Sequence, residues 1–218
     1  MATPRDAPRL LPDFSFETAA FARGLTIVAG VDEAGRGPLA GPVIAAAVIL
    51  DPAHIPPGLN DSKQLSAKRR EALYAQILQV ADVAIGAASV DEIDAINILR
   101  ASHLAMVRAV AGLRQTPQHV LIDGPLCPRG FTLSAQPIIR GDTLCLSIAA
   151  ASIVAKTWRD RLMVDLAQQF PGYGWDHNAG YPTKGHKNAL QNLGATPHHR
   201  RSFKPVHNIL YQAKNLSD

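Results

Sequence analysis

The sequence is poor in cysteine and lacks a long hydrophobic run, and each shortage excludes a class of protein. Of 218 residues only Cys127 and Cys145 are cysteines, and neither lies in a CxxC or Cys/His pattern. A disulfide scaffold is therefore excluded, and we expect a reducing, cytoplasmic location. The longest apolar run, residues 43–50, is too short to cross a bilayer, and no basic segment followed by a hydrophobic core opens the chain. We therefore expect neither a membrane anchor nor a secretory signal.

Acidic side chains are missing from one segment near the C-terminus. Between His177 and His207 there is no Asp or Glu, whereas five basic side chains, five of the eight histidines and Tyr181 lie there. The basic side chains are Lys184, Lys187, Arg200, Arg201 and Lys204. Such a segment suits a phosphate backbone, and the alternative is a solvated tail whose histidines cap and pack. Zinc at His198 and His199 is disfavoured, because adjacent side chains diverge and no cysteine or carboxylate is near.

The composition is otherwise that of a globular protein with alternating strands and helices. Hydrophobic residues make up 47% of the chain and charged residues 18%, which excludes wholesale disorder. We expect a partly ordered leader (1–24), a main domain (25–175) and a basic helical subdomain (176–218). Periodicity and breakers predict strands at 83–90, 119–122 and 137–140, and helices at 16–23, 66–80, 91–113 and 144–170. This order predicts an α/β domain.

Residues 25–50 organise the rest of the chain. They read as two buried strands joined by a glycine-rich turn, and the tight link between them requires a mixed sheet. Asp32 and Glu33 end the first strand. In a regular strand adjacent side chains point to opposite faces of the sheet. Asp32 and Glu33 can therefore share one ion only if the strand ends or bends there, which Gly30 and Gly35 permit. A dinucleotide-binding loop is disfavoured, because the spacing is GxGxxxG and no helix follows. A turn with a purely structural role stays an open alternative.

Four carboxylates fall at the ends of predicted elements. Asp32 and Glu33 end one strand, Asp123 ends another, and Asp142 precedes a helix. Gathered at one edge of a sheet, they would repel one another without divalent cations, and oxygen ligands favour Mg²⁺ or Mn²⁺. Two such ions could activate a water for attack on a phosphodiester, so acids and a basic segment together suggest a nuclease. Taken singly, Asp123 could be a turn former and Asp142 a helix cap.

Several long motifs, in order, resemble the bacterial type 2 ribonuclease H (ribonuclease HII) family. The run VDEAGRGPLAGPV at 31–43 resembles the signature of the family. The likeness continues through LNDSKQLS at 59–66, VLIDG at 120–124, RGD at 140–142, SIAAASIVAKTWRD at 147–160, GYPTKGH at 180–186 and GATPHHRRSF at 194–203. It covers nearly all of 25–207. The leader matches none of these motifs.

The resemblance implies a fold, an activity and a set of site residues. The expected fold is a ribonuclease H-like mixed sheet of about five strands flanked by helices, with a C-terminal helical extension. The expected activity is hydrolysis of the RNA strand of RNA/DNA hybrids and cutting 5′ of single ribonucleotides in duplex DNA, leaving 3′-hydroxyl and 5′-phosphate ends. The family's metal ligands and its substrate-reading residues would be carried here by Asp32, Glu33, Asp123, Asp142, Gly35, Arg36, Gly37 and Tyr181. Lys63 and Lys184 are weaker candidates, for phosphate contact.

The implied mechanism uses two Mg²⁺ or Mn²⁺ ions, with Asp32 and Asp123 bridging or sharing them and Glu33 and Asp142 holding one each. Ribonucleotide excision repair and RNA primer removal would be the cellular tasks. We expect a monomer, and residues 208–218 contain no obvious sliding-clamp docking peptide. Two rivals stay open: a type 1 ribonuclease H or resolvase with the same fold, and a hybrid-binding module without catalysis.

Overall fold

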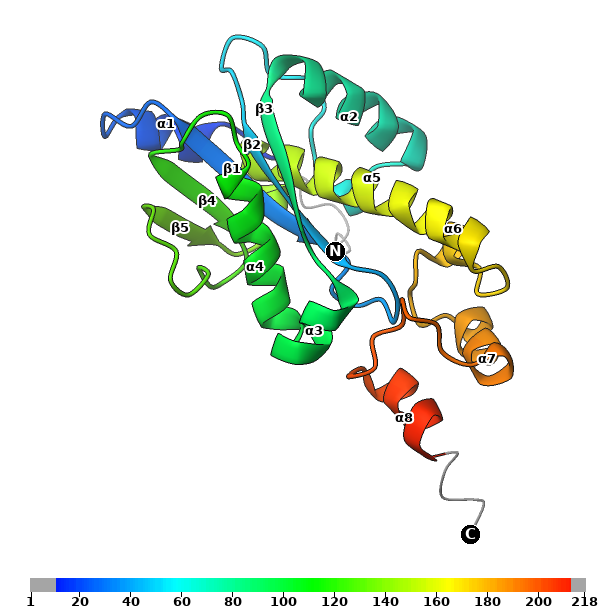
Figure 1. Ribbon diagram of the computed structural model, residues 1–218. Coiled ribbons are helices and arrows are strands. Elements are labelled where there is room, and N and C mark those ends of the chain that lie inside the picture. The colour runs from blue at the N-terminus through cyan, green and yellow to red at the C-terminus, as the bar shows by residue number, and fades with distance from the viewer. Residues whose placement is uncertain (1–10, 213–218) are drawn as a thin grey trace, which may run out of the picture.

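A five-stranded mixed sheet forms the centre of the computed structural model, which describes residues 11–212 (Figure 1). The strand order is β3-β2-β1-β4-β5, with antiparallel pairing from β3 to β1 and parallel pairing from β1 to β5. The strands are β1 (Val28–Ala34), β2 (Val43–Ile49), β3 (Asp82–Ala88), β4 (His119–Asp123) and β5 (Ala135–Ile138). The expected α/β class and mixed sheet are confirmed.

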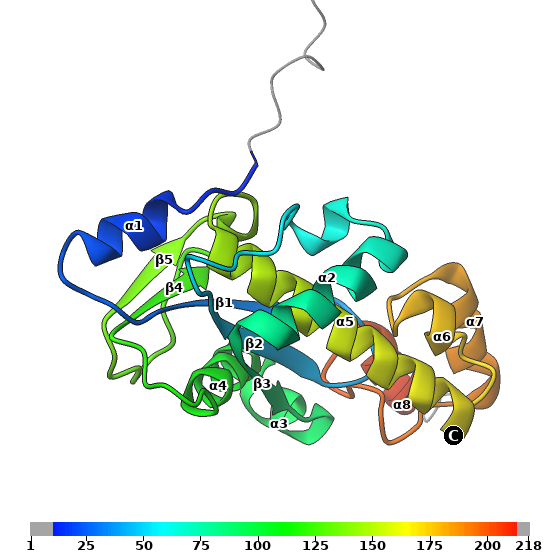
Figure 2. The same ribbon diagram turned by 90° about the horizontal axis from the view of Figure 1, so that it is seen from above.

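Helices cover both faces of this sheet (Figure 2). Helices α2 (Ala67–Val80) and α5 (Leu146–Gln169) pack on one face with even-numbered residues of β2, such as Ala46. Helix α4 (Ile98–Ala111), with α3 (Val90–Ile96) before it, packs on the other face with odd-numbered residues, such as Ala45. Both faces are buried, which explains why the central strands read as continuous apolar runs.

The first half of α5 lies unusually close to β1. Its residues Ile148 to Ala155 are buried, and most are small. Gly30 of β1 faces this helix, and a Cβ there would overlap the backbone of Ser147 and Ile148. The missing side chain therefore lets α5 and β1 approach each other, and these two elements carry much of the site described below.

The leader contributes to the start of α5. Helix α1 (Ser15–Phe21) confirms the short helix expected there, and its Glu17 is buried. Glu17 Oε1 accepts hydrogen bonds from the Ser147 backbone N–H at 2.8 Å and from the Cys145 thiol at 3.1 Å. A carboxylate at a helix N-terminus satisfies a free N–H and complements the helix dipole. The role of residues 1–10 lies outside the described part of the chain.

In the part of the chain that the structure describes, three helices follow α5 and form the expected helical extension: α6 (Trp175–Asn178), α7 (Lys184–Leu193) and α8 (Lys204–Gln212). In Figure 1 they lie beyond the end of the sheet where the β1–β2 connection turns. The boundary at 175/176 falls within α6 and stays a prediction. Between residues 11 and 212, no helix combines the length and apolar character that crossing a membrane requires.

Several predicted elements need correction. The helix predicted at 91–113 is two helices, broken at Asn97, whose φ of +67° is incompatible with a helix. The apolar residues of the helix at 66–80 predict that Val80 lies on its inner side with Leu73 and Ile77, but Val80 is exposed. The last strand lies at Ala135–Ile138 rather than 137–140, because Arg140 takes a left-handed backbone with φ of +59° and cannot extend the strand.

The break at Asn97 gives a stability prediction. Its side chain accepts from the N–H groups of Leu99 and Arg100 and so caps α4, while its own backbone lies in a region that favours glycine. We expect Asn97→Ala to lower the free energy of unfolding by about 2 kcal/mol, because the cap is lost and the strain stays. Asn97→Gly should cost less than about 0.5 kcal/mol, because relief of strain offsets the lost cap. Chemical denaturation of both variants checks this, and equal losses would contradict it.

Candidate active site

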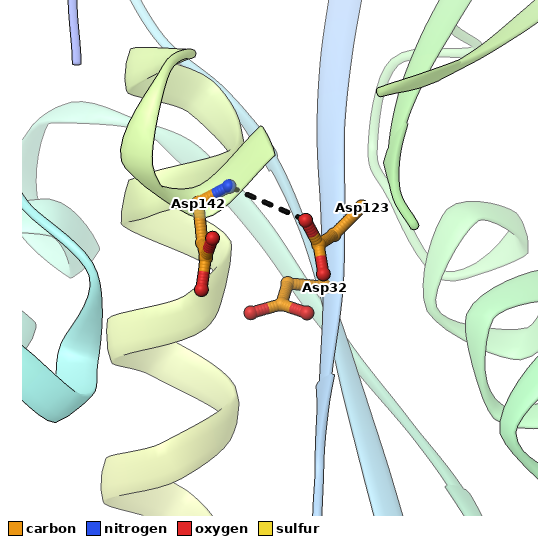
Figure 3. A group of neighbouring side chains, drawn as sticks. All are labelled: Asp32, Asp123 and Asp142. Atoms are coloured by element: carbon orange, nitrogen blue, oxygen red, sulfur yellow. Dashed lines mark hydrogen bonds between the residues drawn. The ribbon is translucent and has the colours of Figure 1, made fainter. Parts of the chain in front are cut away.

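Two of the predicted acids lie side by side at the ends of parallel strands. The register pairs Val31 of β1 with Ile122 of β4, so Asp32 and Asp123 are the next residues along adjacent strands. Parallel strands end at the same edge of a sheet, which brings their carboxylates together. Figure 3 shows both side chains directed toward one another and toward Asp142.

The third acid arrives from the turn that precedes α5. Asp142 lies in a 3-10 turn at Gly141–Thr143, and its N–H donates to Asp123 Oδ1 at 3.4 Å (Figure 3). One carboxylate oxygen from each of Asp32, Asp123 and Asp142 lies within 4.8 Å of the others. Asp32 and Asp142 are buried and Asp123 is partly buried. The predicted convergence of these three residues is therefore observed.

Glu33 does not join this group. Strand β1 continues past Asp32 to Ala34 with unbroken pairing to β2, so the backbone alternation holds. Asp32 pairs with Ala46, on the α5 face, whereas Glu33 pairs with Ala45, on the α4 face. The Glu33 carboxylate instead accepts from Arg36 at 3.2 Å. A role for Glu33 as a metal ligand stays a prediction.

Burial and mutual repulsion make the ionised acids costly. Burial first, and then the charges of Glu33 and Asp123, raise the pKa of Asp32 well above its usual range. Burial also raises the pKa of Asp123 and of Asp142, and Asp123 adds to the increase at Asp142. Each shift disfavours the charged form, and a bound cation would reverse it. Three carboxylates that converge in a partly buried site fit a hard divalent cation, which prefers oxygen ligands.

Lys63 lies at the edge of the acid group. Its Nζ is 3.6 Å from Asp142 Oδ2 and 3.9 Å from Asp61 Oδ1. Burial lowers the pKa of Lys63, but the nearby carboxylates outweigh this, and the pKa is raised overall. The Lys63 side chain is largely exposed, so its ammonium can also reach a phosphate. Lys63 thus lies beside the acids, and its contact with a phosphate stays a prediction.

The predicted substrate-reading residues surround a cavity of about 220 Å³ next to the acids. Its walls include Glu33, Gly35, Arg36, Gly37, Lys63, Ser152, Arg159 and Tyr181. Tyr181 is 42% exposed, and a Cβ on Gly37 would lie 3.4 Å from its ring. The glycine-rich loop and Tyr181, far apart in sequence, therefore face one space. Lys184, at the start of α7, is exposed and is not among the residues that line this cavity.

The structure corrects the interpretation of the basic segment at Arg200. The sequence groups Arg200 with the phosphate-binding candidates. In the structure its side chain is fully buried and donates to four backbone carbonyls. His186 and His199 are also buried and hydrogen-bonded to each other, which fits the packing alternative for these two histidines. The sequence carried no signal for the burial of Arg200, because its partners are main-chain oxygens.

Comparisons with known proteins agree with this geometry. The family model described as Ribonuclease HII matches residues 29–206. The ribonuclease HII of Ruegeria pomeroyi is 68% identical over 201 residues, covering 92% of this chain and 86% of the relative. The ribonuclease H2 of Pyrococcus horikoshii OT3 superposes with a TM-score of 0.72 at 27% identity, covering 88% of this chain and all of that structure. The ribonuclease HII of Archaeoglobus fulgidus, solved with PCNA, gives 0.70 at 26% identity, covering 84% and 96%.

The family match spans most of the chain, and the relative at 68% identity covers nearly all of it. The fold matches solved ribonucleases of this type, and three of the four acids that carried the resemblance converge on one site. The chain therefore belongs to the ribonuclease HII family of endoribonucleases, hydrolases that act on the RNA of RNA/DNA hybrids.

Proposed function

We propose that this protein cuts duplex DNA on the 5′ side of single embedded ribonucleotides, besides acting on continuous RNA/DNA hybrids. The observation that carries the proposal is the shared cavity: the Gly35-Arg36-Gly37 backbone and the Tyr181 ring face one space beside the aspartates. A loop at this position can test for one 2′-hydroxyl while the neighbouring nucleotide is DNA. Recognition then requires one ribose rather than a run of them.

Each residue of the site has a distinct task in this proposal. Asp32, Asp123 and Asp142 hold Mg²⁺ or Mn²⁺, with Glu33 as a further ligand. Bound divalent cations supply activation of the attacking water and stabilisation of the departing 3′-oxygen. Lys63 holds a phosphate of the cleaved strand, and Lys184 contacts the backbone further along. The products have 3′-hydroxyl and 5′-phosphate ends.

A labelled DNA duplex with one ribonucleotide tests this function. We expect a single cut on the 5′ side of the ribonucleotide with Mg²⁺ or Mn²⁺, and none with chelator or with an all-DNA duplex. A protein that cuts only tracts of several ribonucleotides would instead behave as a type 1 ribonuclease H, and the assignment of Gly35 to Gly37 would be wrong. A duplex bound in Mg²⁺ but not cut would favour the non-catalytic alternative.

The exposed ring of Tyr181 gives a separable prediction. Stacking of an aromatic ring on a nucleotide is worth about 1–3 kcal/mol, so Tyr181→Ala should lower kcat/KM on the single-ribonucleotide duplex by about 10-fold or more. Tyr181→Phe keeps the ring and should stay close to the wild type. Tyr211→Ala, at an exposed tyrosine of α8, is the matched control and should have no effect. Equal activity of the Tyr181 and Tyr211 alanine variants would remove Tyr181 from the substrate site.

A further inference from the structure

Two buried arginines support the glycine-rich loop from behind. Arg159 of α5 is 1% exposed and Arg200 is 0% exposed. In the described part of the chain neither forms an ion pair with a carboxylate. Burial lowers the pKa of both guanidinium groups, and the charge of Arg159 lowers that of Arg200 further. Burying two neighbouring cations is costly. The hydrogen bonds that each guanidinium donates offset part of this cost, and apolar side chains could not form them.

Within residues 11–212, all the hydrogen bonds of the Arg200 side chain go to one loop. Its Nη2 donates to the Gly35 carbonyl at 2.6 Å, and its Nη1 donates to the carbonyls of Arg36 at 3.1 Å and Pro38 at 2.8 Å. Its Nε donates to the Gly41 carbonyl at 2.9 Å. One planar guanidinium thus fixes the direction of four peptide groups between residues 35 and 42.

The direction of these carbonyls determines what the loop presents to a ligand. In a trans peptide the N–H points opposite to the C=O, so the N–H groups of Arg36 and Gly37 point away from Arg200. Both residues are exposed, and within residues 11–212 neither N–H donates a hydrogen bond to the protein. A charge-assisted bond at a carbonyl also polarises its peptide and strengthens the donor on the other side. The loop therefore carries two aligned donors on its open face.

Arg159 joins the same loop to the segment that holds Tyr181. Its Nε and Nη2 donate to the carbonyls of Pro42 at 3.1 Å and Ala40 at 3.0 Å, and its Nη1 donates to the carbonyl of Ala179 at 2.9 Å. The Leu39 N–H also donates to the Gly180 carbonyl at 2.7 Å. This guanidinium and the Leu39–Gly180 hydrogen bond together join the loop to the segment that carries Tyr181.

Gly35 shows how closely the loop rests on Arg159. Its φ is +99°, and a Cβ there would overlap the Arg159 side chain. The glycine is thus required by the arginine behind the loop, in addition to any close approach of a ligand in front of it.

We propose that Arg159 and Arg200 are positioning residues that hold the Gly35–Gly41 backbone and Tyr181 as one rigid reader of the ribose 2′-hydroxyl. The inference rests on the proposed function, because it assigns the reading to this loop. Both arginines act through the loop, since Arg200 does not line the cavity and Arg159, which does, is only 1% exposed. Lysine at either position keeps the charge but cannot bond several carbonyls in the planar arrangement of a guanidinium.

The test compares Arg200→Lys and Arg159→Lys with two exposed controls outside the basic segment, Arg129→Lys and Arg161→Lys. The affinity for a single-ribonucleotide duplex is divided by that for the all-DNA duplex, with chelator present to prevent cutting. We expect this ratio to fall toward one in the buried variants, with kcat/KM lower by about 100-fold, as a misplaced binding group costs. The controls should keep the wild-type ratio.

Two further measurements separate positioning from general damage. Calorimetric Mn²⁺ binding should be unchanged in the buried variants, because the aspartates lie on other elements, and amide exchange of 35–41 should become faster. If the buried-arginine variants bind Mn²⁺ normally and their backbone amides at 35–41 exchange at the wild-type rate, the inference is wrong, whatever their substrate preference. A wild-type protein with no ribonucleotide preference would overturn the reading function itself. If Arg200→Lys does not fold, the result for Arg159→Lys tests the inference, because this variant retains the four hydrogen bonds that Arg200 donates to the loop.

Discussion

Asp123→Asn and Asp32→Asn should each lower kcat by about 10³-fold or more while leaving the fold intact. Each variant removes one negative charge from the group of three carboxylates that lie within 4.8 Å of one another. A cation site contributes several kcal/mol of transition-state stabilisation, and each 1.36 kcal/mol is tenfold in rate. Asparagine keeps the shape and one oxygen, so the side chain in Asp123→Asn can still accept from the N–H of Asp142.

Stability should move in the opposite direction from activity in these variants. The folded-state pKa of Asp32 and Asp123 is raised, so at neutral pH the ionised carboxylates destabilise the metal-free fold. Neutral asparagine removes that cost, and thermal midpoints in chelator should equal or exceed that of the wild type. Asp165→Asn, at an exposed acid of α5, is the control and should retain full activity. An Asp123→Asn variant with most of its activity would exclude Asp123 from the metal site.

Gly30→Ala should lower the free energy of unfolding by about 3 kcal/mol, near the upper end for an overpacked core. The added Cβ would overlap backbone atoms of Ser147 and Ile148, which cannot rotate away as a side chain can. For a protein of this size the thermal midpoint should fall by about 10 °C. The displaced α5 would also carry Asp142 away from Asp32, so Mn²⁺ affinity should fall as well.

A matched glycine separates this effect from the intrinsic difference between glycine and alanine. Gly185, in the first turn of α7, has an ordinary backbone and open space where a Cβ would stand. Gly185→Ala should therefore be neutral or slightly stabilising. Denaturant unfolding of both variants checks the pair. Equal midpoints for them would show that α5 and β1 are not in contact at Gly30.

Much of the fold could be predicted from local sequence, because its signals are short-range. The apolar runs and breakers predicted the strands and most helices, and the tight link after β1 predicted a mixed sheet. The break at Asn97 was not predicted, because the spacing of apolar residues does not reveal the backbone conformation from which its side chain caps α4. The shifted β5 was missed because a left-handed residue at Arg140 ends the strand, and arginine gives no sequence signal for that conformation.

The positions of the site residues could be predicted where these residues lie at strand ends. They could not be predicted where they depend on tertiary contacts. Asp32 and Asp123 follow from parallel strands that end together, and this geometry is observed. Glu33 lies outside the group of three carboxylates, because β1 pairs with β2 without a break from Asp32 to Ala34, and its role as a ligand stays a prediction. The burial of Arg200 depends on carbonyls about 160 residues earlier in the chain, so charge pattern alone placed it on the surface.

Anomalous diffraction from crystals grown with Mn²⁺ tests the central claim most directly. The account predicts a peak within about 2.2 Å of carboxylate oxygens of Asp32, Asp123 and Asp142, a distance typical of a small divalent cation. The same map shows whether Glu33 turns to join them. An enzyme that cuts in Mn²⁺ but whose crystals bind manganese elsewhere, with these three carboxylates unliganded, would contradict the account.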